Sequence, residues 1–346
     1  MKKLKIAQVA PLWFSVPPLK YGGTERIISF LSEKLTEKGH RVSLFATANS
    51  KTKAKLISLR KKGVIEAGGR WNAYYWNVLN HSMAFEKAEQ FDIIHCHWEI
   101  MGTYFQRFVK TPVLHTLHNI PGPKNPMWTV FKHYQKDANL VFISQREKKN
   151  AVIKGRNNWV IYNGIDLKPF KFNAKPKNHF IWVARVCPEK GIENAIKIAK
   201  KAKVKLLMAG QIQAHHQDYF NKKIKPQLGR NIKFIGELNQ DKLAVFYRQA
   251  KGLLYPINWQ EPFGLVIVES MAAGTPVIAF RKGSVPELIK NNKNGFIVNN
   301  IAQGAQAVKE IESINRADCR KHIEDNFTID KMVDNYEKLY YKLLKK

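Results

Sequence analysis

Short runs of apolar residues alternate with longer segments of helical periodicity along the whole chain. The runs at residues 5–10 and 41–46 predict buried strands, and residues 24–38 between them predict a helix that Gly39 ends. Three further strand patterns follow, at residues 91–95, 112–116 and 139–143. Strands that alternate with helices in this way are typical of a parallel sheet covered by helices.

Residues 167–178 interrupt this alternation with two prolines and four lysines and predict a linker. A second series follows, with strands expected at 179–185, 205–209, 231–235, 252–255 and 276–280 and helices at 192–201, 240–249 and 265–273. We therefore expect two doubly wound α/β domains, residues 1–168 and 169–328, with the carboxyl ends of their strands facing each other across a cleft. Residues 329–346 predict a C-terminal helix that packs back on the structure.

The charge of the chain is strongly positive, with 58 lysines and arginines against 27 acidic residues among 346, a formal net charge of +31. The excess is spread over both halves, and 45 lysines stand against only 13 arginines. Because the arginine fork is favoured for reading bases and gripping phosphates, this composition is weak support for a nucleic-acid-binding protein. It does predict attraction to polyanions and to anionic lipid headgroups.

No apolar run approaches the roughly 20 residues of a membrane span, and the polar start of the chain does not resemble a signal peptide. Cys96, Cys187 and Cys319 lie far apart with no Cys-x-x-Cys pair, so neither disulfides nor a structural zinc site is expected. These features favour a cytoplasmic enzyme, with peripheral contact to the inner face of the membrane left open.

Two carboxylates are predicted beside one helix start in the segment 259–276. Pro262 disfavours helix at Glu261, which places Glu261 in a loop, whereas Glu269 falls about one turn inside the next helix. The backbone N–H groups of Phe263, Gly264 and Leu265 would form an anion site at that helix start. The spacing equally fits a solvated loop glutamate and a surface helix glutamate.

Two cations follow the first strand of the second half, since Arg185 ends that strand and Lys190 stands just before the helix. Both could point toward a diphosphate, although cations in so basic a chain are more often solvated. In the first half, Gly22 and Gly23 lie between strand and helix, where a Rossmann-like unit approaches phosphate, but without the Gly-x-Gly-x-x-Gly pattern.

Histidines gather at the ends of two strands of the first half, in His95-Cys96-His97 and at His115 and His118. Alternate residues of a strand point to opposite faces, which separates Cys96 from its neighbours and argues against a metal site. His118, just past a strand end, is the better functional candidate.

Together these segments resemble the retaining glycosyltransferases of family 4, which have the GT-B fold of two Rossmann-like domains. The resemblance rests on Glu261-x7-Glu269, on Arg185-x4-Lys190, and on the strings at 21–26, 38–42, 91–95, 116–119, 162–166 and 274–277. One departure is Ala184, where the family usually has glycine.

The resemblance implies a role for each matched residue in handling a nucleotide diphosphate sugar, of which a UDP-sugar is the commonest in the family. Glu261 would contact the donor sugar and Glu269 the nucleotide ribose, while Arg185 and Lys190 would bind the diphosphate. His118 would lie near the reacting sugar. Phe263, Gly264, Leu265, Gly22 and Gly23 would line the donor site. No metal and no other cofactor would be required.

The acceptor is expected in the first domain, as a glycan, a lipid-linked molecule or a small molecule. Aromatic faces suit sugar rings, and the basic runs 51–62 and 148–156 suit an anionic acceptor or membrane, although core packing and solvation explain such residues more often. The candidate aromatic residues are Trp13, Trp71, Trp76, Trp98 and Trp128. A nucleotide-sugar epimerase or a phosphorylase with the same fold, and a nucleic-acid-binding protein, remain as alternatives.

Overall fold

The computed structural model describes residues 2–20, 22–70, 74–120 and 124–345. The chain divides into two compact units, one formed by Met1–Gly164 with Ile329–Lys346 and the other by Ile165–Thr328. We call them unit 1 and unit 2. The chain passes from one unit to the other after Gly164 and returns after Thr328, so the last helix belongs to unit 1.

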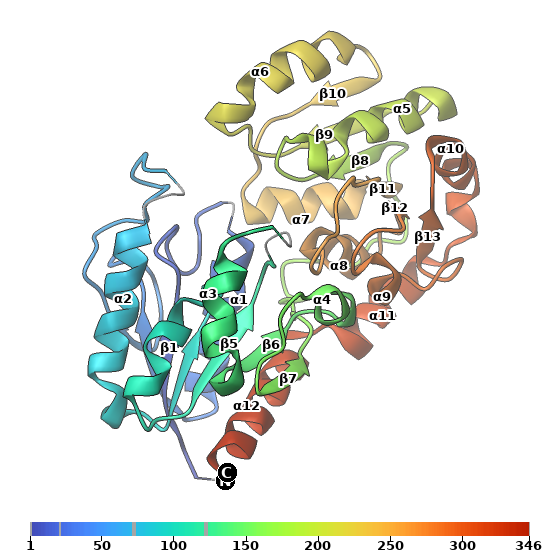
Figure 1. Ribbon diagram of the computed structural model, residues 1–346. Helices are drawn as coiled ribbons and strands as arrows, with labels where there is room; N and C mark the ends of the chain where they lie inside the picture. Colours follow the sequence, from blue (N-terminus) through green and yellow to red (C-terminus); the bar gives the residue numbers. More distant parts are fainter. Residues whose placement is uncertain (1, 21, 71–73, 121–123, 346) are drawn as a thin grey trace. The chain divides into compact units, whose positions relative to one another are not determined.

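Unit 1 contains a seven-stranded sheet in which all pairings are parallel (Figure 1). Its strand order is β3-β2-β1-β4-β5-β6-β7, so the first strand lies near the centre and the chain winds outward in both directions. The strands are β1 (Lys5–Val9), β2 (Arg41–Phe45), β3 (Lys55–Ile57), β4 (Ile93–Cys96), β5 (Val113–Leu117), β6 (Asn139–Phe142) and β7 (Asn157–Val160). Its α-helices are α1 (Gly23–Glu37), α2 (Tyr74–Glu86), α3 (Met127–Tyr134), α4 (Gln145–Asn150) and α12 (Ile329–Leu344).

Unit 2 contains a six-stranded sheet, again with parallel pairings, in the order β10-β9-β8-β11-β12-β13. The strands are β8 (Phe180–Val183), β9 (Leu206–Ala209), β10 (Ile232–Phe234), β11 (Gly252–Tyr255), β12 (Val277–Phe280) and β13 (Gly295–Val298). The α-helices are α5 (Ile192–Ala202), α6 (Gln217–Tyr219), α7 (Gln240–Gln249), α8 (Leu265–Ala272), α9 (Val285–Leu288), α10 (Ile301–Glu310) and α11 (Arg316–Asn326). Both units are Rossmann-like, as predicted. The strand order reverses beside β8 and β11, which is where such sheets bind ligands.

The C-terminal helix α12 packs on unit 1 with a continuous buried stripe that includes Met332, Tyr336, Tyr340 and Leu343. It lies against α1, where Lys38 pairs with Glu337 at 2.6 Å and with Asp334. Burial of a stripe of this length stabilises the helix far more than its intrinsic propensity does.

The prediction of a free linker at residues 167–178 is wrong. This stretch belongs to unit 2, and Phe170 is buried there against Tyr247. Two arginines of α11 bind its backbone: Arg316 donates to the Asn173 carbonyl at 2.7 Å and Arg320 to the Phe170 carbonyl at 2.6 Å. Prolines and lysines gave the stretch the composition of a linker, but contacts from 150 residues away anchor it.

Candidate active site

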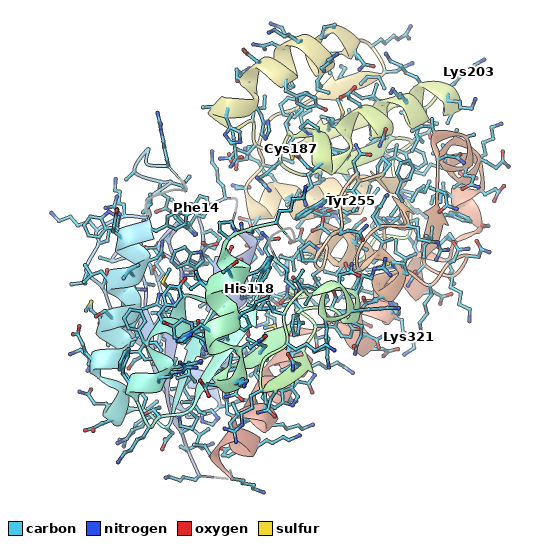
Figure 2. All side chains as sticks on the ribbon, viewed as in Figure 1. Phe14, His118, Cys187, Lys203, Tyr255 and Lys321 are labelled. Atoms are coloured by element: carbon cyan, nitrogen blue, oxygen red, sulfur yellow. The ribbon has the colours of Figure 1, made fainter. Side chains whose placement is uncertain are left out.

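Glu261, in the loop after β11, is the centre of a polar cluster in unit 2. Its Oε2 accepts hydrogen bonds from the Tyr255 hydroxyl and from the Trp259 indole N–H at 3.1 Å, and it pairs with the Lys190 ammonium at 2.7 Å. The Lys190 ammonium also lies 4.4 Å from the centre of the Trp259 ring, a cation–π contact. Tyr255, labelled in Figure 2, ends β11 and thereby places its hydroxyl at the carboxyl end of the sheet.

Glu261 is buried yet charged. Burial acts to raise the pKa of its carboxyl, but Lys190 and the hydrogen bonds from Tyr255 and Trp259 outweigh it, so the pKa lies below its ordinary value. The alternative of a solvated loop glutamate is therefore wrong. The local backbone supports this arrangement, since Trp182 donates to the Lys190 carbonyl at 3.1 Å and Gly191 adopts a left-handed φ of 67°.

Glu269 is also buried, on the inner face of α8, and accepts a hydrogen bond from the Tyr247 hydroxyl at 3.0 Å. The alternative of a surface helix residue is wrong here too. Gly264 precedes the helix with φ 94°, a left-handed conformation that glycine adopts without strain, and among the described residues no side chain caps the helix. Phe263 is buried, and its carbonyl accepts a hydrogen bond from the Ser284 hydroxyl. These contacts fix the loop before Leu265.

Arg185 follows β8, and its Nη1 donates to the Gln213 side chain at 3.3 Å. The backbone at this strand end is tightly packed, because a Cβ added at Gly210 would lie only 1.7 Å from the Ala184 carbonyl oxygen. Gly210, directly after β9, therefore lets the backbone of the two strand ends approach closely at Ala184, the departure from the family pattern. Arg185, Lys190, Glu261 and Glu269 all belong to unit 2.

The remaining predicted residues lie in unit 1. Gly22 precedes α1 with φ 144°, and a Cβ there would meet Pro18 at 2.7 Å, so the turn needs glycine. Gly23 is the first residue of α1. His118 follows β5 (Figure 2), and its Nε2 lies 3.1 Å from Nδ1 of His97. Burial lowers the pKa of His118 to about 3, so its imidazole is neutral at pH 7.

Comparison with known proteins decides the family. The sequence model of the "Glycosyl transferases group 1" matches residues 165–326, and that of "Glycosyltransferase Family 4" matches residues 21–169. This protein belongs to the GT-B glycosyltransferases of the family 4/group 1 type. It is 25% identical over 85% of both chains to an uncharacterized glycosyltransferase of Methanocaldococcus jannaschii, and 23% identical over 81% of its length to a glycogen synthase of Mycobacterium tuberculosis, covering 79% of that protein.

Solved structures show the same fold. The sucrose-phosphate synthase of Thermosynechococcus elongatus superposes with a TM-score of 0.81 at 20% identity, covering 99% of this chain and all of that one. Anabaena HepE, solved in complex with UDP-glucose, superposes with a TM-score of 0.75 at 19% identity, covering 98% of this chain and all of that one. The predicted GT-B fold is confirmed, and the chain is a glycosyltransferase.

Two acidic residues of the glycosyltransferase escaped the sequence analysis. Glu25 is buried in the first turn of α1, and burial raises its pKa to about 8. Glu99 follows β4 with a left-handed φ of 42°, and burial raises its pKa to about 7. A non-glycine residue held in that conformation at the carboxyl end of a strand is the signal that could have drawn attention to Glu99, but it is visible only in the backbone.

The described residues bring together one set that could hold a metal ion, Cys187, Glu189 and His216 of unit 2, whose ligand atoms lie within 4.8 Å of one another. Thiolate, carboxylate and imidazole are ligands that zinc accepts. The His95-Cys96-His97 run is divided as predicted: Cys96 joins an apolar cluster with Val9 and Phe45, while the rings of His95 and His97 lie 3.9 Å apart.

Most of the tryptophans expected to bind sugar are core residues. Trp13 and Trp98 pack edge to face at 5.8 Å in a buried cluster, and Trp128 is one of the buried residues of α3. For these three the expectation of a sugar-stacking face is wrong. Trp76 is 38% exposed on α2, with the Arg60 guanidinium 4.7 Å above its ring, and Trp71 lies outside the described residues.

The basic run 148–156 lines a hollow of about 420 Å³ in unit 1, beside β7 and the end of α12. Four cations surround it: Lys148, Lys154, Arg156 and Lys342. The run 51–62 instead adjoins α2, through the contact between Arg60 and Trp76. Among the described residues, no helix has the length and apolar character that crossing a membrane requires.

Proposed function

We propose that this glycosyltransferase moves a sugar from a UDP-sugar to an acceptor hydroxyl, with retention of configuration at the anomeric carbon. The observation that carries the proposal is the polar cluster of unit 2, in which a buried charged glutamate and a lysine meet beside the start of α8. Such a cluster offers a carboxylate for sugar hydroxyls next to a cation for a diphosphate.

The charges of the reaction fit the charges of the cluster. The bond between the anomeric carbon and the diphosphate oxygen breaks, so positive charge develops on the sugar and negative charge on the departing UDP. Arg185, Lys190 and the N-terminal end of α8 would stabilise the departing diphosphate. Lys190 is held by Glu261 without ligand, so we expect the diphosphate to draw the ammonium away and free Glu261 for the sugar.

No side chain is assigned as a nucleophile in this scheme, so retention would require attack from the front face of the sugar. The acceptor oxygen would bond to the anomeric carbon from the side that the diphosphate leaves, and the acceptor proton would pass to the leaving phosphate oxygen. His118 would hydrogen-bond the transferred sugar. The two cations would take the place of a divalent metal, and we propose that the transfer needs neither metal nor another cofactor.

The comparisons support a UDP-sugar as donor, because Anabaena HepE, of the same fold, was solved with UDP-glucose. Glu269 is suited to the ribose, since a carboxylate accepts hydrogen bonds from two neighbouring hydroxyls. An epimerase or a phosphorylase is not favoured, because the matched relatives are described as glycosyltransferases or synthases. We further propose that the acceptor is a glycan or a lipid-linked molecule reached at an anionic membrane surface.

Isothermal calorimetry with UDP, ADP and GDP in the presence of EDTA tests the donor assignment. We expect metal-free binding with a preference for UDP. Lys190→Met combined with Glu261→Gln, which leaves no unpaired buried charge, should weaken binding by about 10- to 100-fold, the effect of one or two charge-assisted hydrogen bonds. Glu269→Gln should weaken UDP binding by a similar factor.

The control is Lys197→Ala, which removes an exposed lysine of α5 in the same unit. It should bind UDP like the wild type. Equal binding by the wild type and the double variant would refute the donor site, and a requirement for divalent metal would refute the metal-free mechanism. Tight binding of a DNA duplex with no nucleotide binding would mean that the charge serves nucleic acid instead.

A further inference from the structure

His118 is the end of a chain of hydrogen bonds that runs through the interior of unit 1. Its Nε2 lies 3.1 Å from Nδ1 of His97, and Nε2 of His97 lies 2.7 Å from the Gln8 side-chain oxygen. The Gln8 amide nitrogen donates to the Tyr340 hydroxyl at 3.0 Å, and that hydroxyl lies 2.7 Å from Nδ1 of His95. The chain therefore joins β1, β4 and α12 to the predicted active-site histidine.

From His95 the hydrogen-bond chain continues to a second residue of α12, Tyr336. Nε2 of His95 lies 2.7 Å from the Thr116 hydroxyl, which lies 3.0 Å from the Tyr336 hydroxyl. From His97 to Tyr336 every member is buried, so the groups depend on one another for partners. Beyond the end of the chain lies the carboxylate of Glu147, whose negative charge adds to burial in raising the pKa of Tyr336.

Each member of this chain has one hydrogen to give along it. Burial lowers the pKa of His95, His97 and His118 far enough that all three rings are neutral, and a neutral imidazole donates from one nitrogen and accepts at the other. The direction of one hydrogen bond consequently sets the direction of the next. When each hydroxyl donates its hydrogen to the next member, only two arrangements are possible: all hydrogens point toward Tyr336, or all point toward His118.

The orientation of the Gln8 amide selects the first arrangement. The Gln8 amide is oriented with its nitrogen toward Tyr340 and its oxygen toward His97, which requires His97 to donate from Nε2 and to accept at Nδ1. His118 must then donate from Nε2, because His97 can only accept.

We propose that His97, Gln8 and Tyr340 are positioning residues that hold His118 as the tautomer protonated at Nε2, which leaves its Nδ1 as a hydrogen-bond acceptor for a substrate hydroxyl. The inference rests on the proposed function in giving that acceptor a substrate. The chain orients His118 without conducting protons, because the Gln8 amide would have to become an imidic acid to pass one on. Through Tyr340, helix α12 would help to orient His118.

The tautomer can be read directly from long-range ¹H–¹⁵N NMR spectra of the full-length protein with ¹⁵N-labelled histidine, with His118 assigned by its loss in His118→Gln. We expect an unprotonated Nδ1 and a protonated Nε2. An internal reference of the opposite kind is present, because Nδ1 of buried His81 lies 2.8 Å from the Asn77 carbonyl and must donate to it.

Variants test the chain link by link. His97→Asn retains an acceptor near the position of Nδ1 and should preserve the His118 tautomer, whereas His97→Leu and Tyr340→Phe should give a mixture of tautomers. The matched control is Tyr341→Phe, which removes a hydroxyl of the same helix that bonds the Lys2 carbonyl instead. We expect release of UDP from UDP-glucose to fall by about 10-fold, the effect of one hydrogen bond, in His97→Leu but not in His97→Asn. Thermal midpoints verify that each variant folds.

The possible outcomes distinguish the hydrogen-bond chain from the proposed role of His118 in sugar transfer. A wild-type His118 protonated at Nδ1, or a tautomer unchanged in both His97→Leu and Tyr340→Phe, overturns the proposal. If His118 has the expected tautomer but His118→Gln releases UDP at the wild-type rate, the proposed orientation of His118 by the hydrogen-bond chain is supported and its role in transfer is refuted.

Discussion

Lys190 and Glu261 are 71 residues apart in the sequence and form one buried ion pair. Taking two charges out of water costs several kcal/mol each, and the pair is retained because Tyr255 and Trp259 complete the hydrogen bonding of the carboxylate. A site that has already removed its charges from water can exchange one anionic partner of Lys190 for another. This makes the pair suitable for a ligand that is both an anion and a sugar.

Glu25 provides a test at the level of a single carboxyl group. Its pKa is about 8 in the fold against an ordinary 4.5, so the folded protein holds this proton more tightly than the unfolded chain. The stabilising contribution is complete below pH 4.5 and is lost as the pH rises toward 8. Glu25→Gln keeps the side chain neutral at every pH and should remove this loss, which is on the order of 3 kcal/mol between pH 5 and 8.

The measurement is the free energy of unfolding by urea at pH 5, 6.5 and 8. The wild type should lose more stability than Glu25→Gln as the pH rises. Glu89→Gln, which replaces an exposed glutamate of the same unit, should follow the wild type at all three values. Parallel curves for wild type and Glu25→Gln would show that Glu25 is ionised in the fold.

The residues of the candidate site could be predicted one by one, but not their pairing. The x7 spacing of Glu261 and Glu269 indicated two carboxylates near one helix start, and both are there. The hydrogen bonds of Tyr255 and Tyr247 to them depend on how β11 and α7 pack beside α8. Burial and partners come from tertiary structure, which is why Glu25 and Glu99 passed unnoticed.

Strands in the middle of the sheet could be predicted from the sequence, because burial on both faces requires a run of apolar residues. The central strands β1, β4, β5 and β6 are apolar because helices cover both faces, and their positions agree with the prediction within two or three residues. The two strands that the sequence analysis missed in unit 1 are the edges of its sheet, β3 and β7. Edge strands are short and often polar, and Asn157 and Asn158 begin β7 accordingly.

Helix α2 was missed for a different reason: its outer face is apolar. Tyr75 is 87% exposed and Leu79 also faces solvent, so the helix shows no clear amphipathic pattern. Arg60 ties the basic run 51–62 to this face through Trp76. Exposed aromatic and aliphatic residues beside basic ones are typical of a surface that contacts anionic membranes.

We therefore predict that α2 contributes to binding of anionic vesicles. In flotation at low salt, Tyr75→Ser combined with Leu79→Ser should reduce the bound fraction several-fold, since each buried side chain contributes about 1–2 kcal/mol. Phe108→Ser is the matched control, because Phe108 is 83% exposed elsewhere in unit 1. Equal flotation of all three proteins would exclude α2, and no flotation of the wild type would exclude membrane contact under these conditions.

For the whole molecule, the two chain crossings lie next to each other. The Ile165 backbone N–H donates to the Phe327 carbonyl at 2.9 Å, and Ile165 bridges Thr328. Beside them in unit 1, the Gly164 N–H contacts the Met332 sulfur. Two adjacent chain crossings are a local geometry that suits a hinge. We therefore predict the hinge at residues 164–165 and 328–329, where the chain passes between the units.

We predict that the two units close when the donor binds. We predict that binding of the nucleotide brings the two units closer together and excludes water, so UDP should lower the radius of gyration by a few per cent from a value of about 20 Å. Small-angle scattering with and without saturating UDP measures this change. The Lys190→Met, Glu261→Gln double variant serves as control at a UDP concentration that just saturates the wild type, where its weaker binding should give a smaller change. A wild type that binds UDP in the calorimeter but keeps its dimensions would show that the donor alone does not drive closure and that the acceptor must supply the remaining free energy.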